Sequence, residues 1–232
     1  MHPRQSQIPF TSQQALACLT ALFFFGCGTP SQNVHPDDMS AERHRQEAAN
    51  DEIAASRSSE RYNPYATRPS PFRELNPTGT GDPLDSVSVY NPTIGNVAAA
   101  ERQRQHARQH REAAQSLERF EEKECRGIAP EVRASCPLLG PAVELRNIDG
   151  GVRVRFPSEL DIDKIVALMR CHFAFAQTRG FEGAAGCPLY MRGIEIRRAP
   201  EWRAVDIVSA DRFVVPEIRA RAREQVLLLG GR

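Results

Sequence analysis

The sequence predicts an α+β fold in which two ββα units form a small antiparallel sheet that is covered by helices on one face. Two strand-like segments with alternating residues flank Asp149-Gly150-Gly151, and a second such pair lies between residues 189 and 209. Each pair precedes an amphipathic stretch typical of a helix. A long charged helix and a disordered tether are expected before this domain.

The strongest signal near the N-terminus is an apolar run from Ala15 to Gly26, which only Thr20 interrupts. Its length fits the hydrophobic part of a secretory signal, which spans ~7–15 residues. A membrane-spanning helix would need about 20 apolar residues, so the run is too short to cross a bilayer. Residues 1–26 are therefore expected to be a signal peptide.

The end of this run, Phe24-Phe25-Gly26-Cys27, resembles the lipobox of bacterial lipoproteins, although Phe24 stands where an aliphatic residue is usual. The resemblance implies that Cys27 carries a lipid anchor with palmitate and becomes the new N-terminus. Because Gly28 rather than Asp follows, it also implies the outer membrane, facing the periplasm. Ordinary cleavage within the small-x-small run at 26–28 and an uncleaved anchor remain as alternatives.

Residues 27–96 are expected to form a disordered tether. They are rich in Pro, Ser, Asn, Thr and Asp and have no sustained apolar period. Such a composition cannot bury enough apolar surface to offset the entropy lost on ordering. A patch at 38–56 contains helix-forming residues, and we expect a transient helix there.

Residues 97–136 are predicted to form a charged helix, over 97–126, and then a helical corner. The helix contains no proline, Gly127 is placed to end it, and Pro130 can begin a second, short helix. A stripe through Ala113, Leu117 and Phe120 is expected to pack on the domain. The first half is polar all round, which predicts that it is solvated or paired with another chain.

The α+β domain is expected over 137–232. In its first hairpin Val152, Val154 and Phe156 share one face, and Asp161 can cap the helix that follows. Strands at 189–198 and 203–209, and a helix that Asp211 caps and that ends near 229, make the second unit, with a helix start at Pro216 as the alternative. The similarity of 143–146 to 194–197 suggests an internal duplication.

The sheet face away from the helices is predicted to be charged, as half-exposed sheets usually are, and it could also be a binding platform. Its residues would be Glu144, Arg146, Arg153, Arg155, Glu195, Arg197 and Asp206.

Four cysteines lie outside the predicted signal and lipidation site, namely Cys125, Cys136, Cys171 and Cys187. An even number of cysteines in an exported protein predicts a disulfide framework, for which three connectivities are possible. We favour the sequential pairs Cys125–Cys136 and Cys171–Cys187.

Metal binding is the alternative use of these residues. Cys171, His172 and Cys187 could bind an ion together with Cys125 or Cys136, but no close C-x2–4-C pair is present. Adjacent residues of a helix also point about 100° apart, which disfavours joint ligation by Cys171 and His172. His106 and His110 share a helix face at a spacing that can hold a metal, yet neighbouring arginines would repel a cation.

The predicted function is that of a membrane-anchored envelope lipoprotein, not an enzyme, whose tethered domain interacts with a protein or a surface. No Ser/His/Asp set, carboxylate pair or phosphate-binding loop is apparent, and no cofactor is expected. The net charge of +1 gives no case for nucleic acid. The partners would be the membrane, through the lipid anchor, and an envelope protein. The alternative is a periplasmic metal-binding protein that uses His106, His110, His172 or reduced cysteines.

A second resemblance supports the same class. The pattern of a glutamate-rich helix ending in a cysteine, Cys136-Pro-Leu-Leu-Gly-Pro141, a Gly-Gly hairpin and Met-Arg-Cys171-His172 is similar to that of bacterial lipoproteins. This resemblance implies no activity.

Overall fold

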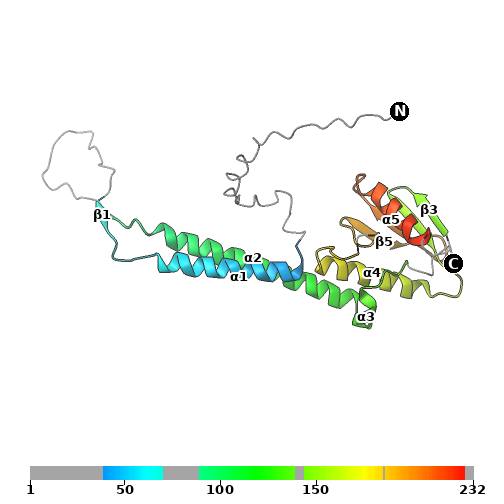
Figure 1. The fold of residues 1–232 in the computed structure, drawn as a ribbon, viewed down its shortest axis with the longest axis horizontal. Helices are drawn as coiled ribbons and strands as arrows, with labels where there is room; N and C mark the ends of the chain where they lie inside the picture. Colours follow the sequence, from blue (N-terminus) through cyan, green and yellow to red (C-terminus); the bar gives the residue numbers. More distant parts are fainter. Residues whose placement is uncertain (1–38, 70–88, 139–143, 185, 228–232) are drawn as a thin grey trace, which may run out of the picture. The chain divides into compact units, whose positions relative to one another are not determined.

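The computed structural model describes residues 39–69, 89–138, 144–184 and 186–227. The predicted signal peptide and Cys27 lie outside these residues. In chain order the helices are α1 (Ala41–Glu60), α2 (Gly95–Glu124), α3 (Pro130–Arg133), α4 (Ile162–Thr178) and α5 (Val215–Leu227) (Figure 1). The strands are β1 (Arg68–Pro69), β2 (Val89–Tyr90), β3 (Glu144–Ile148), β4 (Gly151–Arg155), β5 (Ile194–Arg198) and β6 (Ala204–Ser209).

Helices α1 and α2 form an antiparallel pair, in which they lie side by side (Figure 1). Both have a buried alanine at every seventh position, a spacing that keeps these residues on one face. Because alanine is small, the two backbones can approach closely. The alanines are Ala41, Ala48 and Ala55 in α1 and Ala100, Ala107 and Ala114 in α2.

Helix α1 corrects the prediction of a disordered tether at residues 41–60, since it is a full helix where a transient one was expected; residues 27–38 and 70–88 of the predicted tether lie outside the described residues. Ser40 caps the helix, since its side chain accepts a hydrogen bond from the backbone N–H of Arg43. Ion pairs then join α1 to α2, for example between Arg111 and Glu52 at 2.9 Å. The segment as a whole is polar in composition, but its small residues form a stripe along one face of the helix. The helix is stabilised only when this stripe packs against a second helix. The polar first half of α2 is therefore paired within the same chain.

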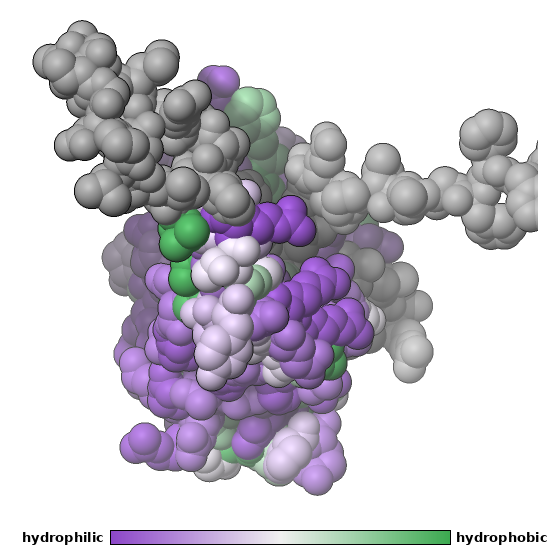
Figure 2. Space-filling model, turned by 90° about the vertical axis from the view of Figure 1, so that its left-hand side faces the viewer, coloured by the Kyte–Doolittle hydropathy of each residue, from purple (hydrophilic) through white to green (hydrophobic). Residues whose placement is uncertain are grey.

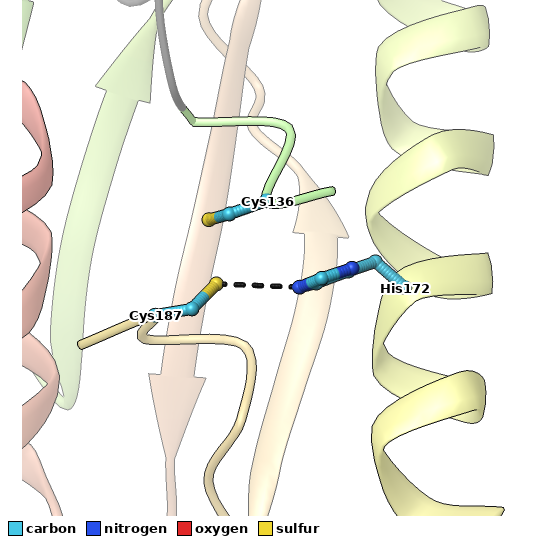
Figure 3. Close-up of side chains that lie close together, drawn as sticks. All are labelled: Cys136, His172 and Cys187. Carbon is cyan, nitrogen blue, oxygen red and sulfur yellow. Dashed lines mark hydrogen bonds between the residues drawn. The ribbon is translucent and has the colours of Figure 1, made fainter. Parts of the chain in front are cut away.

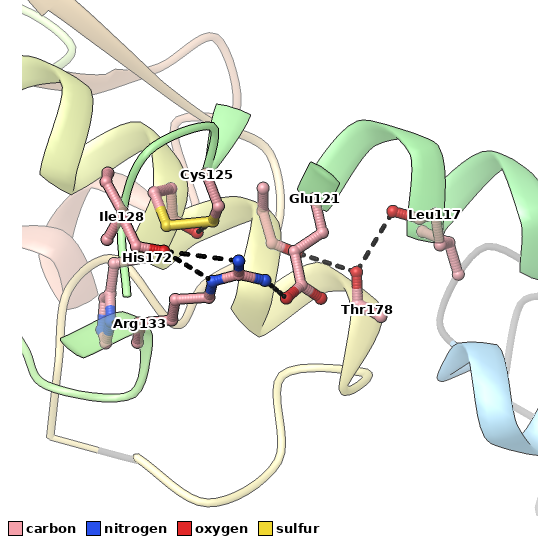
Figure 4. A network of polar contacts seen from close by, with 9 residues as sticks. Leu117, Glu121, Cys125, Ile128, Arg133, His172 and Thr178 are labelled. Atoms are coloured by element: carbon pink, nitrogen blue, oxygen red, sulfur yellow. Dashed lines mark hydrogen bonds and ion pairs between the residues drawn. A yellow bond between two sulfur atoms is a disulfide. The ribbon is translucent and has the colours of Figure 1, made fainter. Parts of the chain in front are cut away.

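The second half of α2 packs on α4, as its stripe predicted. Leu117 is half-buried, and its carbonyl oxygen accepts a hydrogen bond of 3.2 Å from the hydroxyl of Thr178 (Figure 4). After α2 the chain turns into α3, which begins at Pro130 as expected. Arg133 of α3 pairs with Glu121 of α2 at 2.9 Å.

The α+β domain has a sheet with the strand order β3-β4-β6-β5, in which every neighbouring pair is antiparallel. Helix α4 follows the β3–β4 hairpin and α5 follows β5–β6, so the predicted α+β class and the repeated ββα order are confirmed. The second strands of the two units, β4 and β6, pair at the centre. One prediction was too long, because β5 begins at Ile194 and the preceding residues from Leu189 form turns.

The core lies between this sheet and helices α4 and α5. Its buried residues come from the inner faces of the strands, from α4 and α5, and from the segments before β3 and β5. The most deeply buried large side chains include Leu138, Val152, Val154, Met169, Leu189, Ile207 and Ile218.

Two glycines shape the turn between β3 and β4. Gly150 has a φ of +73°, a conformation that side chains rarely adopt. A Cβ atom on Gly151 would lie 2.0 Å from the carbonyl oxygen of Ile207, so β4 and β6 approach too closely there for any side chain.

The open face of the sheet carries the predicted charged residues. Arg153 makes two hydrogen bonds to the carboxylate of Asp206, at 2.6 and 2.8 Å, and one to Glu201. Arg146 is exposed on the neighbouring strand.

The side of the molecule that faces the viewer in Figure 2, which is the left-hand side in Figure 1, is mostly hydrophilic and has small separate hydrophobic areas. Among the described residues, no helix is both long and apolar enough to cross a membrane.

Candidate metal centre

A single disulfide bond is present among the described residues, and it joins Cys125 to Cys171. Cys125 directly follows α2, whereas Cys171 lies in the middle of α4, and both are buried. The expected pairs Cys125–Cys136 and Cys171–Cys187 are therefore wrong. The packing of α2 on α4 brings Cys125 to Cys171, and this contact between distant segments cannot be inferred from spacing.

The other two cysteines, Cys136 and Cys187, are free and buried, and they lie with His172 in a compact cluster (Figure 3). Cys136 is in the loop after α3, His172 is on α4, and Cys187 is in the loop before β5. The two sulfur atoms and a ring nitrogen all lie within 4.8 Å of one another. Three segments that are far apart in the sequence thus converge on one point.

The orientation of His172 is fixed by the backbone of α3. Its Nδ1 atom is 2.7 Å from the carbonyl oxygen of Arg133. A carbonyl oxygen can only accept a hydrogen bond, so Nδ1 carries the proton. In the neutral ring, Nε2 then keeps its lone pair, and it lies 3.4 Å from the sulfur of Cys187 (Figure 3). Metal-binding histidines are commonly held in this way.

The carbonyl group of Arg133, which contacts His172, is held in place by further contacts that reach α2. Besides its pair with Glu121, the Arg133 guanidinium donates to the carbonyl oxygen of Ile128 (Figure 4). These contacts fix the short helix whose last residue faces His172. The Cys125–Cys171 disulfide lies beside the same network. His172 is therefore held by a connected set of contacts from α2 to α4.

The pKa values of the two cysteines are shifted in opposite directions. The pKa of Cys136 is lowered to about 5, chiefly because its thiolate accepts a hydrogen bond from Cys187; burial opposes this effect, and the adjacent His172 adds to it. The pKa of Cys187 is raised, first by that same hydrogen bond and then by burial. Near neutral pH the pair thus consists of one thiolate and one thiol.

This arrangement is suited to two chemical outcomes. Thiolate sulfur and imidazole nitrogen are common ligands of zinc and copper ions. Alternatively, oxidation would join Cys136 to Cys187 in a second disulfide, which would complete a crossed pairing with Cys125–Cys171. Ligand atoms bound to one ion at about 2.0–2.3 Å lie roughly 3.3–4 Å apart. The 3.4 Å between Nε2 of His172 and the sulfur of Cys187 lies in this range, and all three candidate ligand atoms lie within 4.8 Å of one another.

The other predicted metal residues are elsewhere. His106 is exposed on α2. His110 lies against His44 of α1, with their Nδ1 atoms 2.9 Å apart and their ring centroids separated by 5.2 Å. The structure therefore brings neither of them to His172. His44 was missed because it lies in the segment predicted to be disordered.

From the sequence we named His172 and the cysteines as possible metal ligands, but we took Cys171 rather than Cys136 as the first cysteine ligand. The signal that could have corrected this choice is the adjacency of Cys171 and His172. Because neighbouring helix residues diverge by about 100°, they must serve different sites.

Comparison with known proteins gives no relative: no protein-family model, curated protein or solved structure matches the chain.

Proposed function

We propose that this chain is an exported, lipid-anchored protein of the cell envelope that acts by binding a partner rather than by catalysis. The observation that carries the proposal is the buried Cys125–Cys171 disulfide. Disulfides persist in oxidising compartments and are rare in the cytosol. A disulfide in the domain and a lipobox-like Cys27 point to the same location.

The anchor is tested by replacing Cys27 with serine in a Gram-negative host. We expect wild-type protein to incorporate labelled palmitate and to fractionate with outer membranes. The Cys27→Ser variant should lose the label and accumulate as precursor. Cys18→Ser, within the apolar run of the signal, is the matched control and should still be processed. Processing and outer-membrane fractionation that are both unchanged in Cys27→Ser would exclude the lipid anchor.

The open sheet face is the surface we assign to partner binding. It presents exposed Arg146 and Arg197 beside Glu144 and Glu195, so it offers both signs of charge to a protein surface. Mixed charge of this kind favours a protein partner of complementary pattern over a uniformly charged polymer. Because β3 and β5 are the edge strands, additional backbone pairing is also accessible at both sides.

This surface is tested with a photo-reactive amino acid placed at position 146 or 197 in living cells. We expect a discrete cross-linked protein from both positions, and its loss when Arg153 is replaced in the same chain, since Arg153 orders the face. Position 159, exposed in the loop before α4, is the control. Equal cross-linking from the control position would contradict the assignment.

A second candidate function, metal binding, is favoured by one specific observation. Cys136, His172 and Cys187 converge from three segments, and the Nε2 lone pair faces the sulfurs. The domain would then hold one ion per chain. Metal analysis of protein purified under nitrogen should find one equivalent, and the Cys136→Ser/Cys187→Ser double variant should contain none. The absence of metal from the wild-type protein after exposure to zinc and copper would reject this function.

A further inference from the structure

The cluster of Cys136, His172 and Cys187 also indicates which kind of ion it suits, and this inference rests on the metal-binding function proposed above. We propose that it is a three-coordinate site for a soft monovalent ion, copper(I), bound by two thiolates and one imidazole. The argument depends on the number of ligands, their chemical type and their burial.

The described residues offer three ligands, and no fourth His, Cys, Asp or Glu among them joins the cluster. The short stretches next to Cys136 and Cys187 in the sequence that lie outside the described residues contain no such residue, because 139–143 reads Leu-Gly-Pro-Ala-Val and residue 185 is alanine. Structural zinc sites almost always have four protein ligands. This cluster therefore lacks the ligand set of a structural zinc site.

Because the cluster is buried, it does not offer the open position at which a water molecule usually serves as the fourth ligand. Catalytic zinc sites with three protein ligands complete their shell with water in an open position. Here His172 is fully buried, Cys187 is 2% exposed and Cys136 is 8% exposed. The ring of Tyr190 lies against His172, with centroids 4.9 Å apart, and shields it further. An ion that is satisfied by three ligands fits such an enclosed site.

The ligand type agrees with this choice. Thiolates are soft ligands that suit copper(I) as well as zinc, whereas copper(II) favours square-planar nitrogen and oxygen sites. The ligand type therefore agrees with copper(I), and the number of ligands distinguishes it from zinc. No carboxylate belongs to the cluster, so hard divalent ions have no suitable ligand.

Binding has a defined proton balance. The Nε2 lone pair can bind the ion directly, and each cysteine that is still a thiol loses its proton to solvent when its sulfur binds. Loading changes the oxidation state of neither the ion nor the sulfurs.

The experiment uses the purified full chain under nitrogen, after free thiols have been counted by alkylation and mass spectrometry. Copper(I) is titrated against a chromophoric copper(I) chelator, and zinc(II) against a zinc indicator. The Cys136→Ser/Cys187→Ser double variant provides the blank for Cys18 and Cys27. We expect one copper(I) that zinc does not displace, and an X-ray absorption spectrum with two sulfurs and one nitrogen around copper.

Single variants test the individual ligands. Cys136→Ser, Cys187→Ser and His172→Gln should each weaken copper(I) binding by more than about 100-fold, because replacing a residue that only holds a metal ligand in place already costs about 10–100-fold. His106→Gln, an exposed histidine, is the matched control and should bind normally. Circular dichroism of each variant checks that the fold is kept.

The outcomes separate the two proposals. Zinc that binds with four ligands and resists copper(I) would overturn the three-coordinate copper site while leaving metal binding intact. A Cys136–Cys187 disulfide, or no bound ion of either kind, would overturn both. Loss of binding in His106→Gln would also contradict the site, since that residue is remote from it.

Discussion

Cys171 and His172 are neighbours in the sequence of α4 but belong to two different sites. The sulfur of Cys171 is bonded to Cys125, and Nε2 of His172 faces the sulfur of Cys187. The turn of the helix separates the two directions by about 100°. As a result, one stretch of α4 both fastens α2 to the domain and contributes to the candidate metal centre.

The disulfide is expected to stabilise the domain substantially. Replacing Cys125 with serine should lower the free energy of unfolding by about 2–4 kcal/mol, because the bond closes a loop over a separation of 46 residues and restricts the unfolded chain. Chemical denaturation without reductant measures this loss. His106→Gln, at an exposed position of α2, is the control and should keep the wild-type stability. Mass spectrometry that shows Cys125 bonded to Cys136 would contradict the assignment.

The alanine stripe of the hairpin can be tested by adding volume. Ala107 has no exposed surface against α1, so Ala107→Leu should force the two helices apart and cost about 1–3 kcal/mol. Hydrogen exchange should then become faster throughout Ala41–Glu60. Ala98→Leu, at an exposed position of the same helix, is the matched control. Unchanged protection of α1 in Ala107→Leu would show that the helices are not packed through this stripe.

Gly151 is predicted to tolerate no side chain. In Gly151→Ala the new Cβ would meet backbone atoms of Ile207, and so the β4–β6 pairing must shift. We expect a clear fall in melting temperature. Gly95→Ala, where the added Cβ meets nothing within 4 Å, should be neutral or slightly stabilising because alanine favours helix. Equal melting temperatures for the two variants would disprove the close approach.

The thiol pair predicts a specific pH dependence in metal-free, reduced protein. The pKa of Cys136 is lowered from an ordinary value of 9.0 to about 5. Between these values the unfolded state binds more protons than the folded state, so this group adds stability as pH rises from about 5 to about 9. The added stability is lost as pH falls through the folded pKa.

Denaturation of wild type and Cys136→Ser at several pH values measures this contribution as their difference. The raised pKa of Cys187 acts in the opposite sense above pH 9, so the difference should peak near pH 9. Arg146→Gln, on the open face of the sheet, is the control and should show no such peak. A difference that is constant from pH 5 to 9 would contradict a lowered pKa.

The secondary structure of the α+β domain could be predicted from the sequence because its signals are local. Alternation around Gly150 and Gly151 specified the first hairpin, and Asp161 specified the start of α4. The charged outer face followed from the same period of two. These features depend on residues within one strand or one helix turn, where side-chain direction follows directly from position.

Contacts between distant segments were decided only by the tertiary structure. Only a transient helix within a disordered tether was predicted where α1 lies, because its alanines are buried only against α2 and the two helices are far apart in the sequence. Glu52 and Arg111, for example, are separated by 59 positions. The cysteine pairing failed for the same reason, since spacing favoured the nearest partner, whereas packing of α2 on α4 selected Cys171. The sequence alone determined that four cysteines lie outside the predicted signal and lipidation site, and that a histidine follows one of them. The packing of the helices decided which of these residues meet.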